Sequence, residues 1–406
     1  MGLTLTKLSE TPTKITLGWT PVAGAIGYRF QSSAQAPKWS HTWDATKTQV
    51  TFGKAEWYKV EALGVEDAGE YPAVVPPGPG YPASYYAGPL GQNNPLPPKD
   101  GAFLICWGVG KAGTDNWPTQ QQKLAGRETA MGRKYDGIMA TYFEEYGEWA
   151  EGRMKWINDR GCIPIVAGFH FNPLNVTQIA NGEADAQIDH RADHFKSLGF
   201  TVMIRMFHEQ DLPQVAYTCK GREVDFVRAW RRIVDSFKAR GANNVGFWWC
   251  PMEGYDRASA DASYPGDAYV DWVGTDTYNY SYVGEDSWST PLHSGWAEFW
   301  ELFDYKTDAG GSPLQNRHDR YGPRKPFVVG ETGCTHDPYA SARKVAWYRD
   351  IPRAARQMEY LRGISFFDQD VSVYEGPKTN WLVDNPSSAL AGFVDMARDP
   401  WFNTRA

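Results

Sequence analysis

Eight short apolar runs that alternate with amphipathic stretches constrain the fold of this chain most strongly. Near-continuous apolar strands are typical of a parallel sheet whose two faces are covered by helices. Two of the intervening stretches, 148–161 and 222–241, have a helical pattern and end at glycine, as helices with a glycine C-cap do. Eight such strands predict an α/β fold, a (β/α)₈ barrel over residues 101–406. The runs lie at 103–110, 137–143, 162–170, 200–207, 244–250, 269–278, 326–331 and 363–368.

The residues before the barrel divide into two further segments. Residues 1–70 contain short alternating runs separated by Pro, Gly and Asp, which predicts a small all-β sandwich. Residues 71–100 hold nine of the 27 prolines. Because proline is excluded from helix interiors and central strands, this segment is predicted to be an extended linker.

Charge and hydropathy exclude several partners. The 41 basic and 48 acidic residues leave a net charge of −7, so no long-range field attracts nucleic acid or an anionic membrane. No apolar stretch reaches the ~18 to 20 residues of a membrane span, and the first residues, MGLTLTKLSETPTK, lack the pattern of a secretory signal. We therefore expect no nucleic-acid partner, no membrane insertion and no export signal.

The sequence gives no sign of a metal or cofactor. Its five cysteines are odd in number, widely spaced and without a CxxC pair, which fits neither a disulfide scaffold nor a zinc cluster. We expect buried thiols, with Cys219 in a polar loop able to be exposed and a single disulfide left open. His208-Glu209 begins like HExxH, but Leu212 stands in place of the second histidine. The GxGxxG at 108–113 is followed by a stretch without an apolar helical face, which Pro118 is expected to interrupt.

Two glutamates follow strands that face each other in the predicted barrel. The fourth run leads through Arg205 into His208 and Glu209, and the seventh ends at Glu331. Active sites of such barrels lie at the carboxyl ends of the strands, so these carboxylates are expected to converge. Glycoside hydrolysis needs one neutral and one ionised carboxyl group, ~5 to 5.5 Å apart for retention and farther apart for inversion.

Other strand-end residues are candidates for the same site. Asp276 and Asp368 are either substrate contacts or loop anchors. Sugar rings stack on aromatic faces, so aromatic residues near strand ends are candidate platforms for sugar binding. Because adjacent residues of a strand point to opposite faces, one of Trp248 and Trp249 is expected to belong to the core. The candidate platforms are Trp107, Trp248, Trp249 and Tyr278.

Three segments resemble glycoside hydrolase family 26, whose members are mostly β-mannanases. They are RMFHEQD at 205–211, YPGDAYVDWVGTDTYN at 264–279 and VVGETG at 328–333. The resemblance implies that Glu209 is the general acid/base and Glu331 the nucleophile of a retaining enzyme. It further implies the following supporting roles: His208 contacts substrate and carboxylate, Tyr278 lies near the nucleophile, Arg205 orients Glu331, and His170 binds sugar.

The chain also departs from the family pattern. Gln210 and Asp211 follow the His-Glu pair where the family has a residue and then asparagine, and Met252 stands where it commonly has asparagine. The eighth strand offers Phe367 and Asp368 in place of a tryptophan. These departures loosen the expected substrate but leave both glutamates in place.

Residues 1–70 resemble a fibronectin type III domain, through Trp19 and the Tyr58-x-Val-x-Ala motif. Such a module before a glycanase barrel, without an export signal, resembles minor tail proteins of phages that infect actinobacteria. That resemblance implies a virion location, contacts with other tail proteins through the N-terminal domain, and a host-envelope polysaccharide as substrate. The alternatives are a secreted, extracellular β-mannanase, a glycan-binding receptor-recognition module without hydrolysis, and a purely structural tail component.

Overall fold

The computed structural model describes the chain as two compact units, residues 1–80 with 357–359 and residues 81–356 with 360–406. The predicted boundaries at 70 and 100 stay a prediction, because almost all of the proline-rich segment lies outside the described residues. Those residues exclude 1–2, 4, 11–13, 24, 26, 33–38, 45, 47, 54–57, 64–66, 72–88, 90–100, 143–147, 172, 254–255, 281–296, 304–315, 337–341, 376–378 and 403–406.

The regular elements described in the N-terminal unit are all β-strands, as predicted. One sheet has the order β1 (Leu5–Glu10), β2 (Lys14–Trp19), β5 (Gln49–Gly53). The other has the order β4 (Trp39–Asp44), β3 (Gly27–Ser32), β6 (Tyr58–Leu63), β7 (Asp67–Tyr71). Every pairing is antiparallel. Trp19 packs edge-on against Tyr28, with ring centroids 5.4 Å apart, in a core that includes Leu17, Phe30 and Val60. The side chain of Tyr58 lies outside the described residues.

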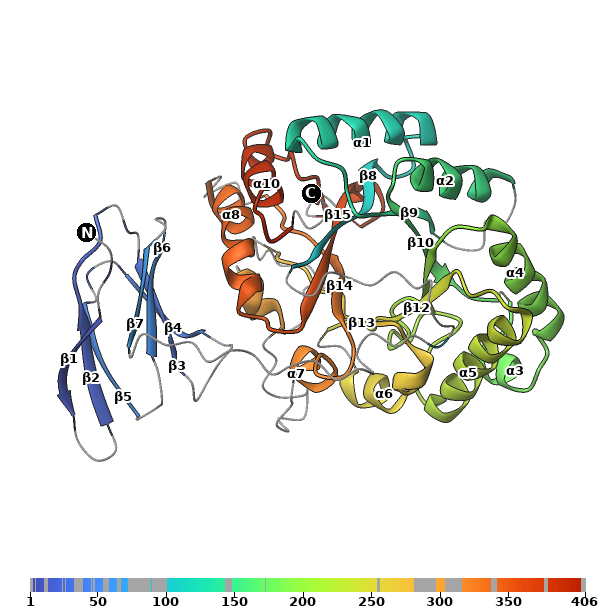
Figure 1. Cartoon of the computed structure of the whole chain (residues 1–406), viewed down its shortest axis with the longest axis horizontal. Helices are drawn as coiled ribbons and strands as arrows, with labels where there is room; N and C mark the ends of the chain where they lie inside the picture. The colour runs from blue at the N-terminus through green and yellow to red at the C-terminus, as the bar shows by residue number, and fades with distance from the viewer. Residues whose placement is uncertain are drawn as a thin grey trace. The chain divides into compact units, whose positions relative to one another are not determined.

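The second unit is a closed barrel of eight parallel strands (Figure 1). Each strand overlaps one of the eight apolar runs, so the predicted (β/α)₈ fold is confirmed. The barrel closes where Gly363 of the last strand pairs with Phe103 of the first. In chain order the strands are β8 (Phe103–Lys111), β9 (Gly137–Tyr142), β10 (Ile163–Phe169), β11 (Val202–Met206), β12 (Val245–Trp249), β13 (Trp272–Val273), β14 (Phe327–Thr332) and β15 (Leu361–Asp370).

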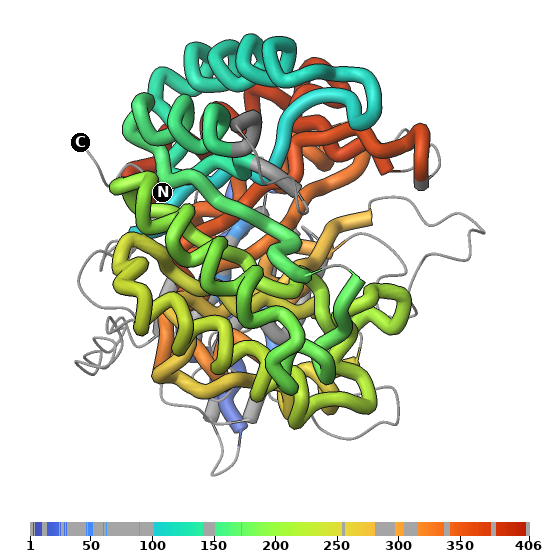
Figure 2. Tube along the Cα trace, turned by 90° about the vertical axis from the view of Figure 1, so that its right-hand side faces the viewer, coloured from blue at the N-terminus to red at the C-terminus, as the bar shows by residue number. Residues whose placement is uncertain are grey.

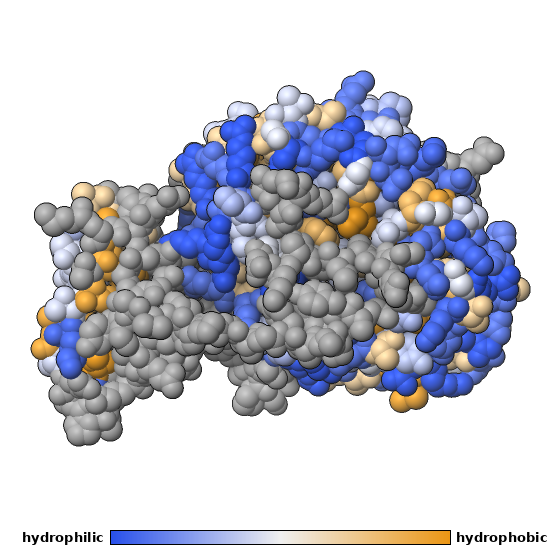
Figure 3. All heavy atoms as spheres, viewed as in Figure 1, coloured by the Kyte–Doolittle hydropathy of each residue, from blue (hydrophilic) through white to orange (hydrophobic). Residues whose placement is uncertain are grey.

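Helices surround the sheet (Figures 1 and 2). In α5 the residues Phe226, Trp230, Ile233 and Phe237 recur at helical spacing and are all buried, while polar residues form much of the exterior seen in Figure 3. The helices are α1 (Trp117–Met131), α2 (Glu148–Asp159), α3 (Val176–Ala180), α4 (Asp185–Leu198), α5 (Glu223–Arg240), α6 (Arg257–Ala262), α7 (Arg317–Tyr321), α8 (Ala342–Arg356), α9 (Ser372–Glu375) and α10 (Ala389–Ala397), with short 3₁₀ helices η2 (Asp267–Tyr269) and η3 (Phe299–Phe303). No helix within the described ranges is both long and apolar enough to cross a membrane.

Two expectations about local structure were wrong. Pro118 does not interrupt a helix: it lies in the first turn of α1, where its missing N–H costs no hydrogen bond, and Asn116 caps that turn. Cys219 is fully buried rather than exposed, with its sulfur 3.5 Å from Ser259 Oγ. All five cysteines are buried thiols.

The sixth strand is shorter than its apolar run because the chain approaches its neighbours closely there. Only Trp272 and Val273 form regular ladder pairs. A Cβ added at Gly274 would meet the Val328 carbonyl oxygen and lie 2.8 Å from Trp248 Nε1. The chain then continues beside β14 through isolated bridges, one of which pairs Asp276 with Glu331. This irregular segment brings Asp276 next to the seventh strand.

We predict that Gly274→Ala destabilises the protein by about 1–3 kcal/mol or more, because the new methyl group would collide with backbone that cannot move aside. The matched control is Gly126→Ala in α1, where a Cβ meets no atom within 4 Å. There we expect stabilisation by about 0.5–1 kcal/mol, since alanine favours the helix. Urea unfolding of both variants checks this, and a Gly274→Ala variant as stable as wild type would contradict it.

Candidate functional site

The two predicted glutamates meet at the carboxyl end of the barrel. Glu209 lies in the turn at 207–211 that follows β11, and Glu331 lies in β14. His208 and Asp276 lie beside them. One side-chain oxygen or nitrogen atom from each of the four residues lies within 4.8 Å of those from the other three. The fourth and seventh strands therefore bring their carboxylates together, as their positions in the barrel require.

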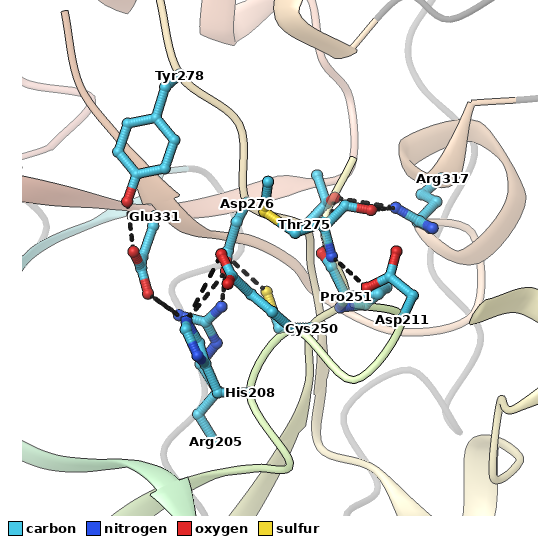
Figure 4. Close-up of polar contacts among 12 residues, drawn as sticks. Arg205, His208, Asp211, Cys250, Pro251, Thr275, Asp276, Tyr278, Arg317 and Glu331 are labelled. Carbon is cyan, nitrogen blue, oxygen red and sulfur yellow. Dashed lines mark hydrogen bonds and ion pairs between the residues drawn. The ribbon is translucent and has the colours of Figure 1, made fainter. Parts of the chain in front are cut away.

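Glu331 is held by three donors from three elements (Figure 4). Its Oε1 accepts hydrogen bonds from Arg205 Nη1 and His208 Nε2, both at 2.7 Å, and its Oε2 accepts one from the Tyr278 hydroxyl. Burial favours the protonated form, but the interactions with His208, Arg205 and Tyr278 outweigh burial and hold the pKa of Glu331 below its usual value. Glu331 is thus an oriented, ionised carboxylate.

Arg205 supplies the charge at the base of the site. Its side chain is fully buried inside the barrel, with the guanidinium carbon 4.6 Å from the ring centre of Trp107 and 5.7 Å from that of Trp248. Besides Glu331 it pairs with Asp276, whose Oδ1 also lies 3.3 Å from Cys250 Sγ. One guanidinium thereby fixes carboxylates from the sixth and seventh strands.

His208 is neutral at pH 7. Burial and, next, the charge of Arg205 lower the pKa of its imidazole to about 4, although Glu331 acts in the opposite direction. Its ring stacks on Trp107, with centroids 6.0 Å apart and planes inclined by 19°. Since Glu331 is an acceptor, the Nε2–H tautomer of His208 makes their hydrogen bond.

Glu209 has a different environment from Glu331. Its side chain keeps 17% of its surface exposed, against 5% for Glu331, and its Oε1 lies 3.8 Å from His208 Nε2. Glu209 and Phe207 both have φ of +50°, the left-handed region that non-glycine residues seldom adopt. Strained backbone of this kind persists only where surrounding contacts hold it.

The structure brings the polar groups of six of the eleven predicted site residues together by hydrogen bonds, ion pairs or close approach: Arg205, His208, Glu209, Asp276, Tyr278 and Glu331. His170, at the end of β10, stands next to this group: its ring packs on Tyr217 at 4.8 Å. The Tyr217 ring also packs on Phe207, in the turn that carries Glu209, with centroids 5.7 Å apart, and burial and then the Glu209 charge raise its pKa.

The remaining four residues serve the surrounding structure. Trp107, Trp248 and Trp249 have fully buried rings, so none offers a free face to a sugar. Trp249 points outward, against Tyr264 and Tyr321, while the other two lie inside the barrel. The Asp368 carboxylate bonds to Arg127 at 2.9 Å and to Val383 N, which are the contacts of a loop anchor.

Sequence reasoning missed several residues of the site. Cys250 follows β12 directly, so its position at a strand end was a usable signal. Trp381 packs on Tyr278, with ring centroids 4.6 Å apart. The ring of Phe367 lies 6.0 Å from the same tyrosine ring. Trp381 lies in a loop well beyond β15, where no periodic sequence pattern predicts the direction of its side chain. Trp381 braces the tyrosine that holds Glu331.

The same four residues could present atoms to a metal ion: His208, Glu209, Asp276 and Glu331. However, two of the three carboxylates already pair with Arg205. A divalent cation there would be repelled by the guanidinium and would compete with it. The donor set thus suits proton chemistry better than metal binding.

We predict that Arg205→Met destabilises the protein by about 3–5 kcal/mol at pH 7, because it leaves two buried carboxylates without their counter-charge. The loss should shrink as the pH falls and those carboxylates take up protons. Urea unfolding across pH 4–7 measures it. Arg240→Met, which breaks an exposed pair with Asp193, is the control and should change little; equal effects of both variants would contradict the prediction.

The lowered pKa of His208 predicts a pH-dependent stability. Between pH 6.5 and 4 the unfolded chain binds a proton on this histidine that the folded chain does not, so acidification favours unfolding. We expect wild type to lose on the order of 1–3 kcal/mol more than His208→Gln over this interval. Unfolding curves at pH 7, 6, 5 and 4 provide the test, and parallel curves for the two proteins would refute it.

Residues 175–302 match the sequence model of glycosyl hydrolase family 26. Endoglucanase H of Acetivibrio thermocellus is 28% identical over 302 residues, which cover 72% of this chain but only 30% of that protein. The chain therefore spans under a third of the length of this curated relative.

Solved structures share the barrel. An endo-beta-1,4-mannanase of Cellulomonas fimi, solved as a double mutant, has a TM-score of 0.50 at 15% identity, covering 75% of this chain and 72% of the mannanase chain. The catalytic domain of a family 26 endo-beta-1,4-mannanase from Bacillus sp. JAMB-750 has a TM-score of 0.51 at 15% identity, covering 74% and 86%. At this identity the likeness concerns the fold. In sequence, the barrel is thus similar to glycosyl hydrolase family 26 over residues 175–302 and to this endoglucanase over a longer range.

Proposed function

We propose that the barrel is a retaining endo-glycosidase that cleaves a polysaccharide, with Glu331 as nucleophile and Glu209 as general acid/base. The observation that carries the proposal is the close approach of these two carboxylates, whose nearest ligand atoms lie within 4.8 Å. Retaining glycosidases hold their carboxyl groups about 5–5.5 Å apart, whereas inverting ones leave about 6.5–9.5 Å for a water molecule. The spacing favours retention.

The environments of the two glutamates suit the two roles. In the first step Glu331 attacks the anomeric carbon while Glu209 donates its proton to the leaving oxygen, giving a glycosyl ester on Glu331. In the second step Glu209 takes a proton from water, which attacks the same carbon and releases Glu331. Burial, and then Glu331, hold the pKa of Tyr278 well above its usual value. Tyr278 thus remains a donor to Glu331.

The substrate is proposed at the level of a class. Similar proteins are named an endoglucanase and endo-beta-1,4-mannanases, so β-glucan and β-mannan are the first polymers to test. Departures at Gln210, Asp211, Met252 and Phe367 argue against assuming mannan. Host cell-envelope glycan is the substrate that the predicted phage-tail setting suggests.

We propose the fibronectin type III-like identity of the N-terminal unit and its contact with other tail proteins as the setting of this activity. The three- and four-stranded antiparallel sheets of that unit support the first part. The virion location rests on the predicted architecture alone. A secreted mannanase and a barrel that binds glycan without cleaving it are the alternatives.

We predict that wild type releases new reducing ends from β-mannan, β-glucan or purified envelope polysaccharide. Glu331→Gln should reduce the release to background, and Glu209→Gln should lower kcat about 10²–10⁴-fold. Proton NMR of the first product formed should show the anomeric configuration of the substrate. These measurements test the activity, the two roles and the stereochemical course.

The control is Glu183→Gln, an exposed glutamate between α3 and α4, which should keep full activity. Inverted product would contradict the retaining mechanism. If no polymer were cleaved while wild type and Glu331→Gln both bound one, the glycan-binding alternative would replace the enzyme.

A further inference from the structure

The turn that carries Glu209 needs external support. Its two left-handed residues, Phe207 and Glu209, are strained, and backbone hydrogen bonds tie it to other segments: Phe207 N donates to Phe169 O of β10, and Gln210 O accepts from Cys219 N. The Gln210 side chain lies 3.0 Å from both Phe207 O and Trp249 Nε1, oriented to donate to the first and accept from the second. Such contacts are needed to hold Glu209 close to Glu331.

Asp211 connects this turn to the neighbouring strand end (Figure 4). Its side chain is fully buried, and its Oδ1 accepts a hydrogen bond from Met252 N at 2.9 Å. Met252 in turn is bridged to Asp276, and its carbonyl oxygen accepts from Arg317. One carboxyl oxygen therefore ties the Glu209 turn to the segment that bears Asp276.

The charges around Asp211 come from three other segments. Arg317 of α7 faces it and also bonds to Thr275 Oγ1 and Glu253. The Glu253 carboxylate raises the pKa of Asp211, and Asp211 in turn raises the pKa of Cys219. Burial raises the pKa of Asp211 to about 6, although Arg317 opposes this. Within the described residues, Asp211 Oδ2 accepts no hydrogen bond.

We propose that Asp211 is a positioning residue for Glu209: its Oδ1 clamps the turn at 207–211 to Met252, and so keeps Glu209 at reacting distance from Glu331. The clamp does not depend on the proposed glycosidase function; only its catalytic consequence rests on that function. An asparagine would supply the same acceptor oxygen without the charge. Asp211→Asn should therefore preserve the clamp, and Asp211→Ala should remove it.

Hydrogen exchange tests the clamp without any activity. In Asp211→Ala we expect the Met252 amide and the amides of the turn at 207–211 to exchange at least about tenfold faster than in wild type, because the buried acceptor is gone. Asp211→Asn should retain protection of the Met252 amide. Unchanged protection of Met252 in a folded Asp211→Ala variant would overturn the clamp, whether or not the protein cleaves glycans.

Kinetics test the consequence for Glu209. Misplacement by about 1 Å can cost about 10²-fold, so we expect Asp211→Ala to lower kcat on a polysaccharide by that factor while KM changes little. Asp211→Asn should recover most of kcat near pH 5, because at a pH below its pKa of about 6 the wild-type carboxyl group is also mostly uncharged. For an aryl glycoside whose leaving group needs no protonation, kcat/KM of Asp211→Ala should stay near wild type. Added azide, which needs no general base, should accelerate its turnover.

The matched control is Asp136→Ala. Asp136 is also buried and accepts a backbone hydrogen bond, from Leu104 N at 2.8 Å, but it directly precedes β9, at the opposite end of the barrel. The Asp136→Ala variant should be less stable than wild type. Any loss of kcat/KM should be the same for activated and unactivated substrates, and azide should not accelerate its turnover. Equal losses of Asp211→Ala on activated and unactivated substrates would overturn the positioning role, even with the clamp intact.

Discussion

The buried guanidinium of Arg205 is the constraint on which the site depends. It lies inside the barrel between the rings of Trp107 and Trp248, with no exposed surface. A charge in such surroundings is tolerated only with close counter-charges, and Asp276 and Glu331 provide them. The sixth and seventh strands are thereby fixed against the fourth. The same charge helps to keep Glu331 ionised, so one interaction contributes to both the stability and the chemistry of the barrel mouth.

The asymmetry between the two glutamates follows from where each lies in its element. Glu331 belongs to a strand and receives donors on both oxygens, which leaves it rigid and ionised. Glu209 lies on a strained turn beyond its strand and keeps more contact with solvent. In the proposed mechanism this difference suits Glu331 to nucleophilic attack and Glu209 to proton transfer. Supports such as Asp211 and Gln210 then matter because the turn has no ladder of its own.

Much of this site could be predicted from sequence because the end of each apolar run marks the end of a barrel strand. Arg205, His208 and Glu209 follow one apolar run and Glu331 ends another, and parallel strands bring those ends to one rim. The roles of the tryptophans could not be predicted, because Trp107, Trp248 and Trp249 differ only in the direction and burial of their rings. Trp381 and Tyr217 come from loops without periodicity. Cys219 lies in a polar stretch yet is buried, since its surroundings come from distant segments.

By itself, the sequence determined the eight parallel strands and the placing of two glutamates at opposite sides of the rim, because the spacing of apolar runs specifies strand number and order. Only the tertiary structure decided how close the carboxylates lie, which donor binds which oxygen, and which contacts keep Glu331 ionised. Those properties arise from contacts such as Arg205 with Glu331, 126 positions apart in the chain, and from burial. Neither the contact nor the loss of water around it leaves a local pattern in the sequence.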